Sequence, residues 1–212
     1  MKSKGFILRL SIVLAMIIAT LFLYPKLPDI IPTHWNFQGQ PDDWGAKTWA
    51  AWLIPGISLL MIILFPILAK IDPRHKNYKK FWGVWEIIQT IIIAFFGFIY
   101  FIQYYMTLYP ENQNLMQPIM LSAVGLLFIV LGNYMGKIRQ NYFVGIKTPW
   151  TLNDKEVWQK THRVGGWAFV IAGILYLFEA WTGLFIGPVF IITITGVVVV
   201  PIVYSYVISK KN

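Results

Sequence analysis

Six long apolar runs, separated by more polar segments, dominate the hydrophobic pattern of this 212-residue chain. A helix needs about 20 mostly apolar residues to cross the hydrocarbon core of a bilayer. Helices are expected because backbone polar groups in lipid must be satisfied within their own segment. The pattern predicts an all-α bundle of six transmembrane helices, a single membrane domain over residues 1–212, with spans at roughly Phe6–Tyr24, Thr48–Ala69, Val84–Tyr105, Pro118–Met135, Val164–Ile186 and Gly187–Ile208.

Lys and Arg lie almost wholly in every second connection between these runs. The three remaining connections hold only Lys26 and Lys47. Because basic residues near spans mark the cytoplasmic side, both termini are predicted to be cytoplasmic, with residues 25–47 outside and residues 136–163 inside. The basic residues that set this orientation are Lys2, Lys4, Arg9, Lys70, Arg74, Lys76, Lys79, Lys80, Lys137, Arg139, Lys147, Lys155, Lys160, Arg163, Lys210 and Lys211.

The composition agrees with a multi-pass protein of a cell membrane. Hydrophobic residues make up 57% of the chain and charged residues 13%, whereas a soluble domain has about a quarter charged residues. The net charge of +9 does not indicate direct binding of nucleic acid, because it is spread over span ends, where it can meet anionic lipid headgroups. Cysteine is absent, which excludes disulfides and thiolate metal sites.

The segment at residues 25–47 is too rich in polar and aromatic residues for a simple connector. Its four prolines exclude a continuous helix. The residues from Ile30 to Phe37 can form an extended segment, and Gln38-Gly39 a turn. Aromatic, amide and acidic side chains on a rigid frame suit a surface that binds a peptide, although a cap over helix ends is the alternative. The candidate binding residues are His34, Trp35, Asn36, Gly39, Pro41 and Asp42.

The segment at residues 136–163 is the second rich connection. The stretch Gly145–Trp150 is expected to be non-helical because Thr148 precedes a proline. A short amphipathic helix is predicted from about Asp154 to Arg163, lying in the membrane surface and ending at Gly165-Gly166. Its cap is either Asn153 paired with Glu156, or Thr151 paired with Asp154.

This inner segment is either an interfacial anchor or a docking surface. A polar network or docking site would use Asn141, Lys147, Thr148, Pro149, Trp150, Thr151, Asp154, Trp158, His162 and Arg163.

Polar residues inside the apolar runs are costly and therefore informative. Glu86, Gln89 and Glu179 could form an interior polar site, but we favour carboxylates near the interface because neither acid lies at mid-span. Gln103 and Asn133 are expected to form interhelical hydrogen bonds, and Gly132 with Gly136 to allow close helix approach.

No chemistry-bearing motif indicates an enzyme or a cofactor. The sequence has no H-E-x-x-H, G-x-S-x-G or P-loop. Its three histidines, His34, His75 and His162, are predicted to lie on opposite sides of the membrane and so cannot form one metal site.

Two motifs resemble those of the SdpI family. One is G-I-K-T-P-W-T-L-N-D-K-E-V-W-Q-K-T-H-R at residues 145–163, preceded by N-Y-F-V. The other, P-T-H-W-N-F-Q-G-Q-P-D-D-W at residues 32–44, resembles the amino-terminal domain of unassigned function in many members. The resemblance implies a bacterial plasma-membrane immunity protein that confers resistance to a secreted, membrane-active peptide toxin, SdpC. It also implies a signalling role, in which the toxin-bound protein recruits a soluble repressor, SdpR.

In that reading the outer segment meets the toxin and the inner segment meets the repressor. Two other hypotheses remain open. One is a small transporter or channel with a polar path lined by Glu86, Gln89, Gln103 and Glu179. The other is a purely regulatory membrane anchor for a transcription factor.

Overall fold

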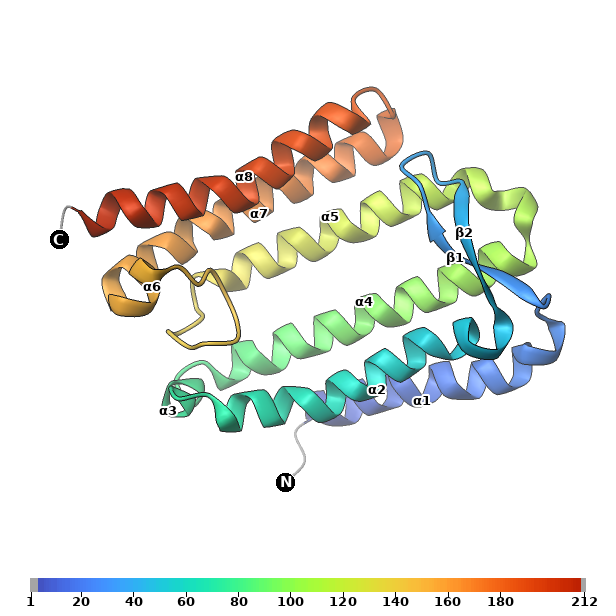
Figure 1. Cartoon of the computed structure of the whole chain (residues 1–212), viewed down its shortest axis with the longest axis horizontal. Helices are drawn as coiled ribbons and strands as arrows, with labels where there is room; N and C mark the ends of the chain where they lie inside the picture. The colour runs from blue at the N-terminus through green and yellow to red at the C-terminus, as the bar shows by residue number, and fades with distance from the viewer. Residues whose placement is uncertain (1–3, 211–212) are drawn as a thin grey trace. The chain divides into compact units, whose positions relative to one another are not determined.

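A computed structural model describes residues 4–210, so Lys2 and Lys211 lie outside the described residues. The elements follow one another along the chain in Figure 1 as α1 (Lys4–Leu23), η1 (Tyr24–Lys26), β1 (Ile30–Trp35), β2 (Pro41–Ala46), α2 (Lys47–Ile71), α3 (His75–Tyr78), α4 (Trp82–Leu108), η2 (Pro110–Leu115), α5 (Met116–Met135), α6 (Pro149–Asn153), α7 (Lys155–Thr182) and α8 (Ile186–Ser209).

Six of these helices, α1, α2, α4, α5, α7 and α8, are long and apolar enough to cross a membrane. The shortest two have 20 residues, about 30 Å at 1.5 Å per residue, which equals the thickness of the hydrocarbon core. Large apolar side chains stay exposed along them, such as Phe22 at 75% and Ile191 at 66%. The six-span prediction is confirmed, and the protein is a multi-pass membrane protein.

The chain divides into two compact units, one formed by Met1–Phe65 with Gln89–Met120 and the other by Pro66–Ile88 with Leu121–Asn212. In the first unit, buried hydroxyls join three helices. Thr20 on α1 contacts the Tyr100 hydroxyl of α4 at 2.9 Å, and the Tyr104 hydroxyl donates to the backbone oxygen of Ala51 on α2 at 3.2 Å. Buried polar pairs of this kind hold helices together where no hydrophobic force acts between them.

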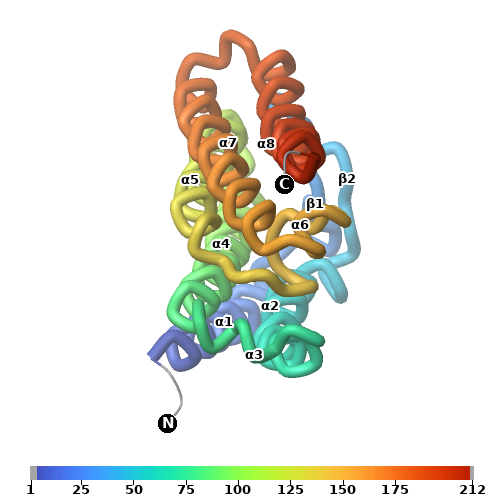
Figure 2. The backbone as a smooth tube through the Cα atoms, turned by 90° about the vertical axis from the view of Figure 1, so that its left-hand side faces the viewer, coloured from blue at the N-terminus to red at the C-terminus, as the bar shows by residue number. Residues whose placement is uncertain are grey.

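In the second unit, α7 and α8 run side by side as an antiparallel pair (Figures 1 and 2). The turn between them begins at Gly183, whose φ of 62° is the left-handed conformation that favours glycine. Glu179 is buried, and its carboxylate accepts from the Phe185 backbone N–H at 2.6 Å. Glu179 lies near the end of its span, as expected, but its buried carboxylate closes this turn and does not reach out to solvent.

A glycine seam joins α5 and α7. A Cβ atom added to Gly132 would lie 2.6 Å from the Gly166 oxygen, and one added to Gly173 would lie 2.5 Å from the Gly125 oxygen. The prediction of close approach at Gly132 is confirmed. Its proposed partner in the motif, Gly136, contributes much less, since its nearest neighbour would be 3.4 Å away.

The predicted surface helix from Asp154 to Arg163 is wrong, because α7 continues unbroken through Gly165-Gly166 to Thr182. The buried face of the first turns continues into the face that packs on α5, so nothing ends the helix there. Both expected caps are also wrong. Asp154 caps α7 by accepting from the Val157 N–H at 2.8 Å, and Thr148 caps the separate short helix α6.

Candidate functional sites

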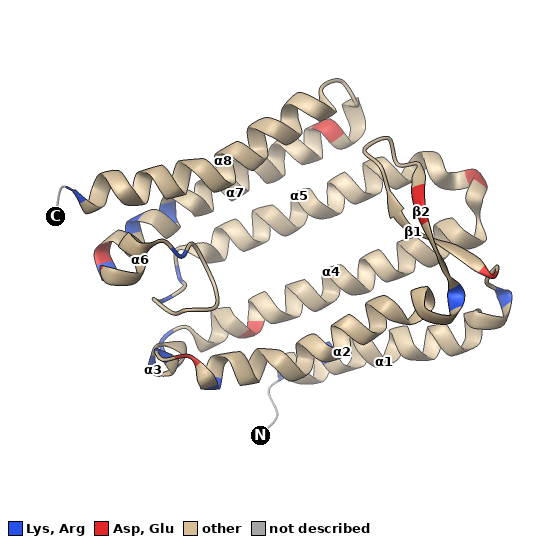
Figure 3. Ribbon diagram, viewed as in Figure 1, with Lys and Arg blue, Asp and Glu red and all other residues tan. Residues whose placement is uncertain are grey.

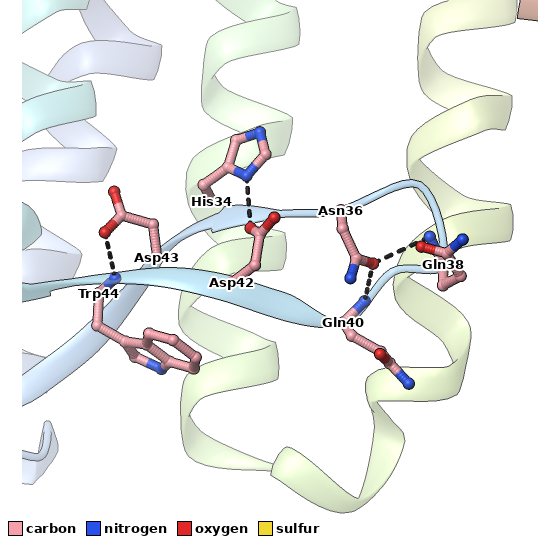
Figure 4. Close-up of polar contacts among 7 residues, drawn as sticks. All are labelled: His34, Asn36, Gln38, Gln40, Asp42, Asp43 and Trp44. Atoms are coloured by element: carbon pink, nitrogen blue, oxygen red, sulfur yellow. Dashed lines mark hydrogen bonds and ion pairs between the residues drawn. The ribbon is translucent and has the colours of Figure 1, made fainter.

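The hairpin formed by β1 and β2 is the first candidate site. Its strands pair antiparallel, with Ile31 opposite Gly45 and irregular register around His34. The expected extended segment and turn are thus confirmed. At the tip, the Asn36 side-chain oxygen accepts from the backbone N–H groups of Gln38 and Gln40, both at 3.0 Å (Figure 4). This short-range capping makes the tip a preformed turn.

Gly39 completes the tip for two independent reasons. Its φ of 72° is unfavourable for other residues. A Cβ atom there would also lie 2.8 Å from the backbone nitrogen of Gln117, in the first turn of α5. Asn36 and Gly39, predicted as binding residues, therefore shape the hairpin.

The base of the hairpin is fixed to its own unit. Ile31 is fully buried, and the Gln103 side chain on α4 donates to the Pro32 oxygen at 2.9 Å. Gln103 thus bonds to the hairpin rather than to another helix, contrary to prediction. The Lys47 ammonium lies 3.0 Å from the Asp29 carboxylate and donates to the Leu27 oxygen at 3.2 Å. These anchors hold the strands in one orientation.

The solvent-facing part of the hairpin is polar and aromatic. The His34 and Asp42 side chains are 66% and 43% exposed and bond to each other at 2.5 Å. Phe37 and Trp44 are more than half exposed. Trp35 and Pro41 are half-buried, so they support this surface from behind. Of the predicted contact residues, His34 and Asp42 are the two that offer polar atoms outward (Figure 4).

The second candidate site is the connection between α5 and α7, together with α3. Asn141 is fully buried and organises the loop. Its side-chain oxygen accepts from the backbone N–H groups of Phe143 and Val144, while its amide donates to the Arg139 oxygen at 2.8 Å. The loop therefore has a fixed path although it is not helical.

A buried carboxylate that the sequence analysis missed locks this loop to α3. Asp72 accepts from the Arg74 N–H at 2.6 Å and from the Tyr142 N–H at 2.8 Å. The Tyr78 hydroxyl also donates to Asp72, at 3.3 Å. Burial, and then the nearby carboxylate, raise the pKa of Tyr78 above its ordinary value. The sequence signal was a single acid within a segment otherwise rich in Lys and Arg.

His162 holds the next part of the loop. It is fully buried and stacks on Trp158 with ring centroids 4.0 Å apart. Its Nε2 accepts from the Ile146 N–H at 3.0 Å, so its Nδ1 carries the proton donated to the Trp158 oxygen at 2.8 Å. The ring is therefore neutral. Gly145 has a φ of 111°, and a Cβ atom there would collide with this ring.

The start of α6 is tied to α8. Thr148 and Thr151 form a reciprocal capping box with Pro149 in the first turn. Pro149 and Trp150 are helical, contrary to prediction, because proline fits the first position of a helix. The Thr148 hydroxyl contacts the Ser205 hydroxyl at 3.0 Å, and the Trp150 ring packs against Tyr206.

Half of the predicted docking residues are thus buried supports of the loop, namely Asn141, Thr148, Thr151, Trp158 and His162. Lys147, Pro149 and Arg163 are exposed, whereas Asp154 and Trp150 are half-buried. The remaining intramembrane candidates stay separate from this loop. Glu86 is half-buried and Gln89 is buried on α4. Asn133 bonds to the Ile129 oxygen of its own helix, so its expected interhelical bond is wrong.

Comparison with known proteins agrees with these two regions. Residues 137–205 match the SdpI/YfhL protein family, and residues 11–59 match a domain of unknown function, DUF1648. The chain is also similar to Immunity protein SdpI of Bacillus subtilis (strain 168), with 27% identity over 213 residues that cover 98% of this chain and 97% of that protein. No solved structure matches the chain. Both motifs lie within the matched residues, so their resemblance to the SdpI family is confirmed.

Proposed function

We propose that this protein is a membrane immunity protein, which protects the cell that makes it from a secreted, membrane-active peptide toxin. The observation that carries the proposal is similarity over nearly the whole length to a protein named for immunity. Buried groups in both candidate sites serve packing and hydrogen bonding, which suits recognition rather than catalysis. The proposed activity is therefore binding of the toxin, without chemical change.

We place toxin binding on the hairpin. A rigid surface with exposed aromatic rings loses little conformational entropy when it binds a peptide. His34 and Asp42 offer polar atoms there, beside the exposed Trp44. A further acid, Asp43, adds negative charge. A toxin of SdpC type, amphipathic and partly cationic on the bound face, is the partner that this surface would accept.

The test is survival of a toxin-sensitive strain that expresses the double variant His34→Ala/Asp42→Ala. We expect at least a tenfold loss of survivors, because the variant removes the polar face without touching the hairpin anchors. The matched control is Glu156→Ala/Lys160→Ala, which deletes an exposed ion pair of the same 2.5 Å length on α7. Equal protection by both variants, at equal amounts in the membrane, would exclude the hairpin as the binding surface.

The proposed orientation has both termini and the α5–α7 connection in the cytoplasm and the hairpin outside. Because the chain has no cysteine, single cysteines can report it directly. Asp43→Cys should react with a membrane-impermeant maleimide in intact cells, and Lys147→Cys should react only after lysis. The reverse labelling pattern would contradict the orientation.

A signalling role would use the cytoplasmic face of the α5–α7 connection to recruit a soluble repressor of SdpR type. The predicted residues that a partner could reach are Lys147, Pro149 and Arg163, which are exposed, and Asp154 and Trp150, which are half-buried. Lys147→Glu/Arg163→Glu should abolish co-sedimentation of the repressor with membranes while leaving toxin survival intact. Unchanged co-sedimentation would remove this surface from the signalling proposal.

The transporter hypothesis receives no support from particular contacts. Two of its four path residues are engaged elsewhere, Gln103 with the Pro32 oxygen and Glu179 with the Phe185 N–H.

A further inference from the structure

A small cavity in the second unit lies beside α3 and the start of α7. Its volume is 90 Å³, which admits a group of a few heavy atoms but not a nucleotide. The side chains around it come from three separate parts of the chain, namely Asn77, Lys80, Arg139, Gln140, Lys155, Trp158 and Gln159. Figure 3 shows Lys and Arg gathered around α3 and the beginning of α7.

The cavity carries uncompensated positive charge. Lys80, Arg139 and Lys155 line it, whereas no acidic side chain does. Within residues 4–210, none of these three cations forms an ion pair. Three like charges around one small space repel each other and create a local potential that attracts an anion.

Nearby acids are already engaged. Glu156 pairs with Lys160 at 2.5 Å, and Asp154 accepts from the Val157 N–H as the cap of α7. Asp72 accepts from the Arg74 and Tyr142 N–H groups. None of these three acids lines the cavity, and among the described residues none pairs with Lys80, Arg139 or Lys155.

The walls of the cavity are fixed by hydrogen bonds of their own. The Trp158 ring nitrogen donates to the Ile138 oxygen at 2.9 Å, and the Asn77 amide donates to the Gln140 oxygen at 2.7 Å. The Gln140 amide donates in turn to the Thr151 oxygen at 2.7 Å. The site is thus held in shape before any ligand arrives, which lowers the entropic cost of binding.

We infer that this cavity binds the phosphate group of an anionic membrane lipid. Lys80 lies two residues before α4, which begins at Trp82, Arg139 lies four residues after α5, which ends at Met135, and Lys155 begins α7. The three cations thus lie at the ends of three membrane-spanning helices, where basic pockets meet lipid headgroups. A guanidinium can bind two phosphate oxygens at once, with ammonium groups as further donors.

The experiment is native mass spectrometry of the purified full-length protein after mixing with phosphatidylglycerol. The variant Lys80→Gln/Arg139→Gln/Lys155→Gln should retain at least tenfold less lipid than the wild-type protein. The matched control, Lys70→Gln/Lys76→Gln/Lys79→Gln, removes the same charge outside the cavity and should retain lipid normally. Thermal unfolding of each protein without added lipid verifies that all three are folded.

Two further binding measurements distinguish a lipid phosphate from free inorganic phosphate as the ligand. Phosphatidylcholine, a zwitterionic lipid, should bind wild-type and variants equally weakly. Inorganic phosphate at millimolar concentration should compete only slightly with phosphatidylglycerol. Equal lipid retention by the cavity variant and the control would overturn the inference. Strong, cavity-dependent binding of inorganic phosphate without retention of lipid would overturn the assignment to a lipid.

Discussion

Replacing Gly132 by alanine tests the glycine seam between α5 and α7. A Cβ atom at this position would lie 2.6 Å from the Gly166 oxygen and 2.9 Å from a Val170 methyl carbon. Comfortable contact between such atoms begins at about 3.5 Å. The two helices would therefore have to separate locally by about 1 Å. Neither neighbouring atom can move aside easily, because one belongs to the helix backbone and the other to a β-branched side chain.

The expected loss is about 1–3 kcal/mol, the usual consequence of inserting a methyl group into a well-packed interior. Alanine favours a helix over glycine by about 0.5–1 kcal/mol, which offsets part of this loss. A net decrease of about 1.4 kcal/mol in the free energy of unfolding corresponds to a tenfold change in the equilibrium constant. Effects of this size are measurable for a purified membrane protein.

The assay is titration of detergent-solubilised protein with sodium dodecyl sulfate, followed by far-ultraviolet circular dichroism. The matched control is Gly196→Ala on α8, where an added Cβ meets nothing within 4 Å. Gly132→Ala should unfold at a lower dodecyl sulfate fraction than wild type, and Gly196→Ala at the same or a higher fraction. If the two variants unfolded at the same dodecyl sulfate fraction, the seam would not depend on close approach of the α5 and α7 backbones.

The other stability predictions use the same titration. Asp72→Asn should lower the free energy of unfolding by about 2–3 kcal/mol, because the amide nitrogen that replaces one carboxylate oxygen cannot accept a hydrogen bond from a backbone N–H. A variant as stable as the wild-type protein would contradict the structural role of this carboxylate. Gly145→Ala should lower it by about 1–3 kcal/mol or more, since φ is positive and the His162 ring blocks the methyl; a neutral effect would mean that the ring moves aside freely. Glu179→Ala should lower the free energy of unfolding by about 1–3 kcal/mol, and Glu179→Gln should lower it much less, because glutamine still offers an acceptor to the Phe185 N–H. Equal losses would mean that the negative charge of Glu179, and not its hydrogen bond, stabilises the turn.

The spans could be predicted from sequence because lipid imposes length and hydropathy directly on each helix. The predicted limits differ from those of α1, α2 and α5 by only one or two residues. The beginning of α7 could not be predicted in this way. Its first turns are polar on one side, and the pair Gly165-Gly166 has the character of a helix stop.

The function of that glycine pair depends on a distant part of the chain. Gly166 permits contact with Gly132, more than thirty residues earlier, and only the tertiary structure supplies that neighbour. Small residues inside membrane helices commonly indicate packing rather than termination. Sequence spacing within α5 alone suggested Gly136 as the partner of Gly132, whereas the seam uses the other helix.

More of the hairpin than of the α5–α7 connection could be predicted from the sequence. The extended segment and turn at Ile30–Phe37 follow from local composition, so the hairpin was foreseeable, although its pairing register was not. Asp72 was missed because its partner, the Tyr142 N–H, lies 70 residues away in sequence. The N-Y-F-V-G and T-P-W-T motifs do mark one site, but mainly because the first fixes the path of the loop and the second caps and begins α6.

The measurement that tests the central proposal most directly is a count of survivors after a sensitive bacterial strain, lacking its own immunity protein, is exposed to the killing peptide. Cells expressing this chain should survive in numbers well above cells with an empty vector. Death at the rate of the empty-vector cells, with the protein confirmed in the membrane, would contradict an immunity function against that toxin.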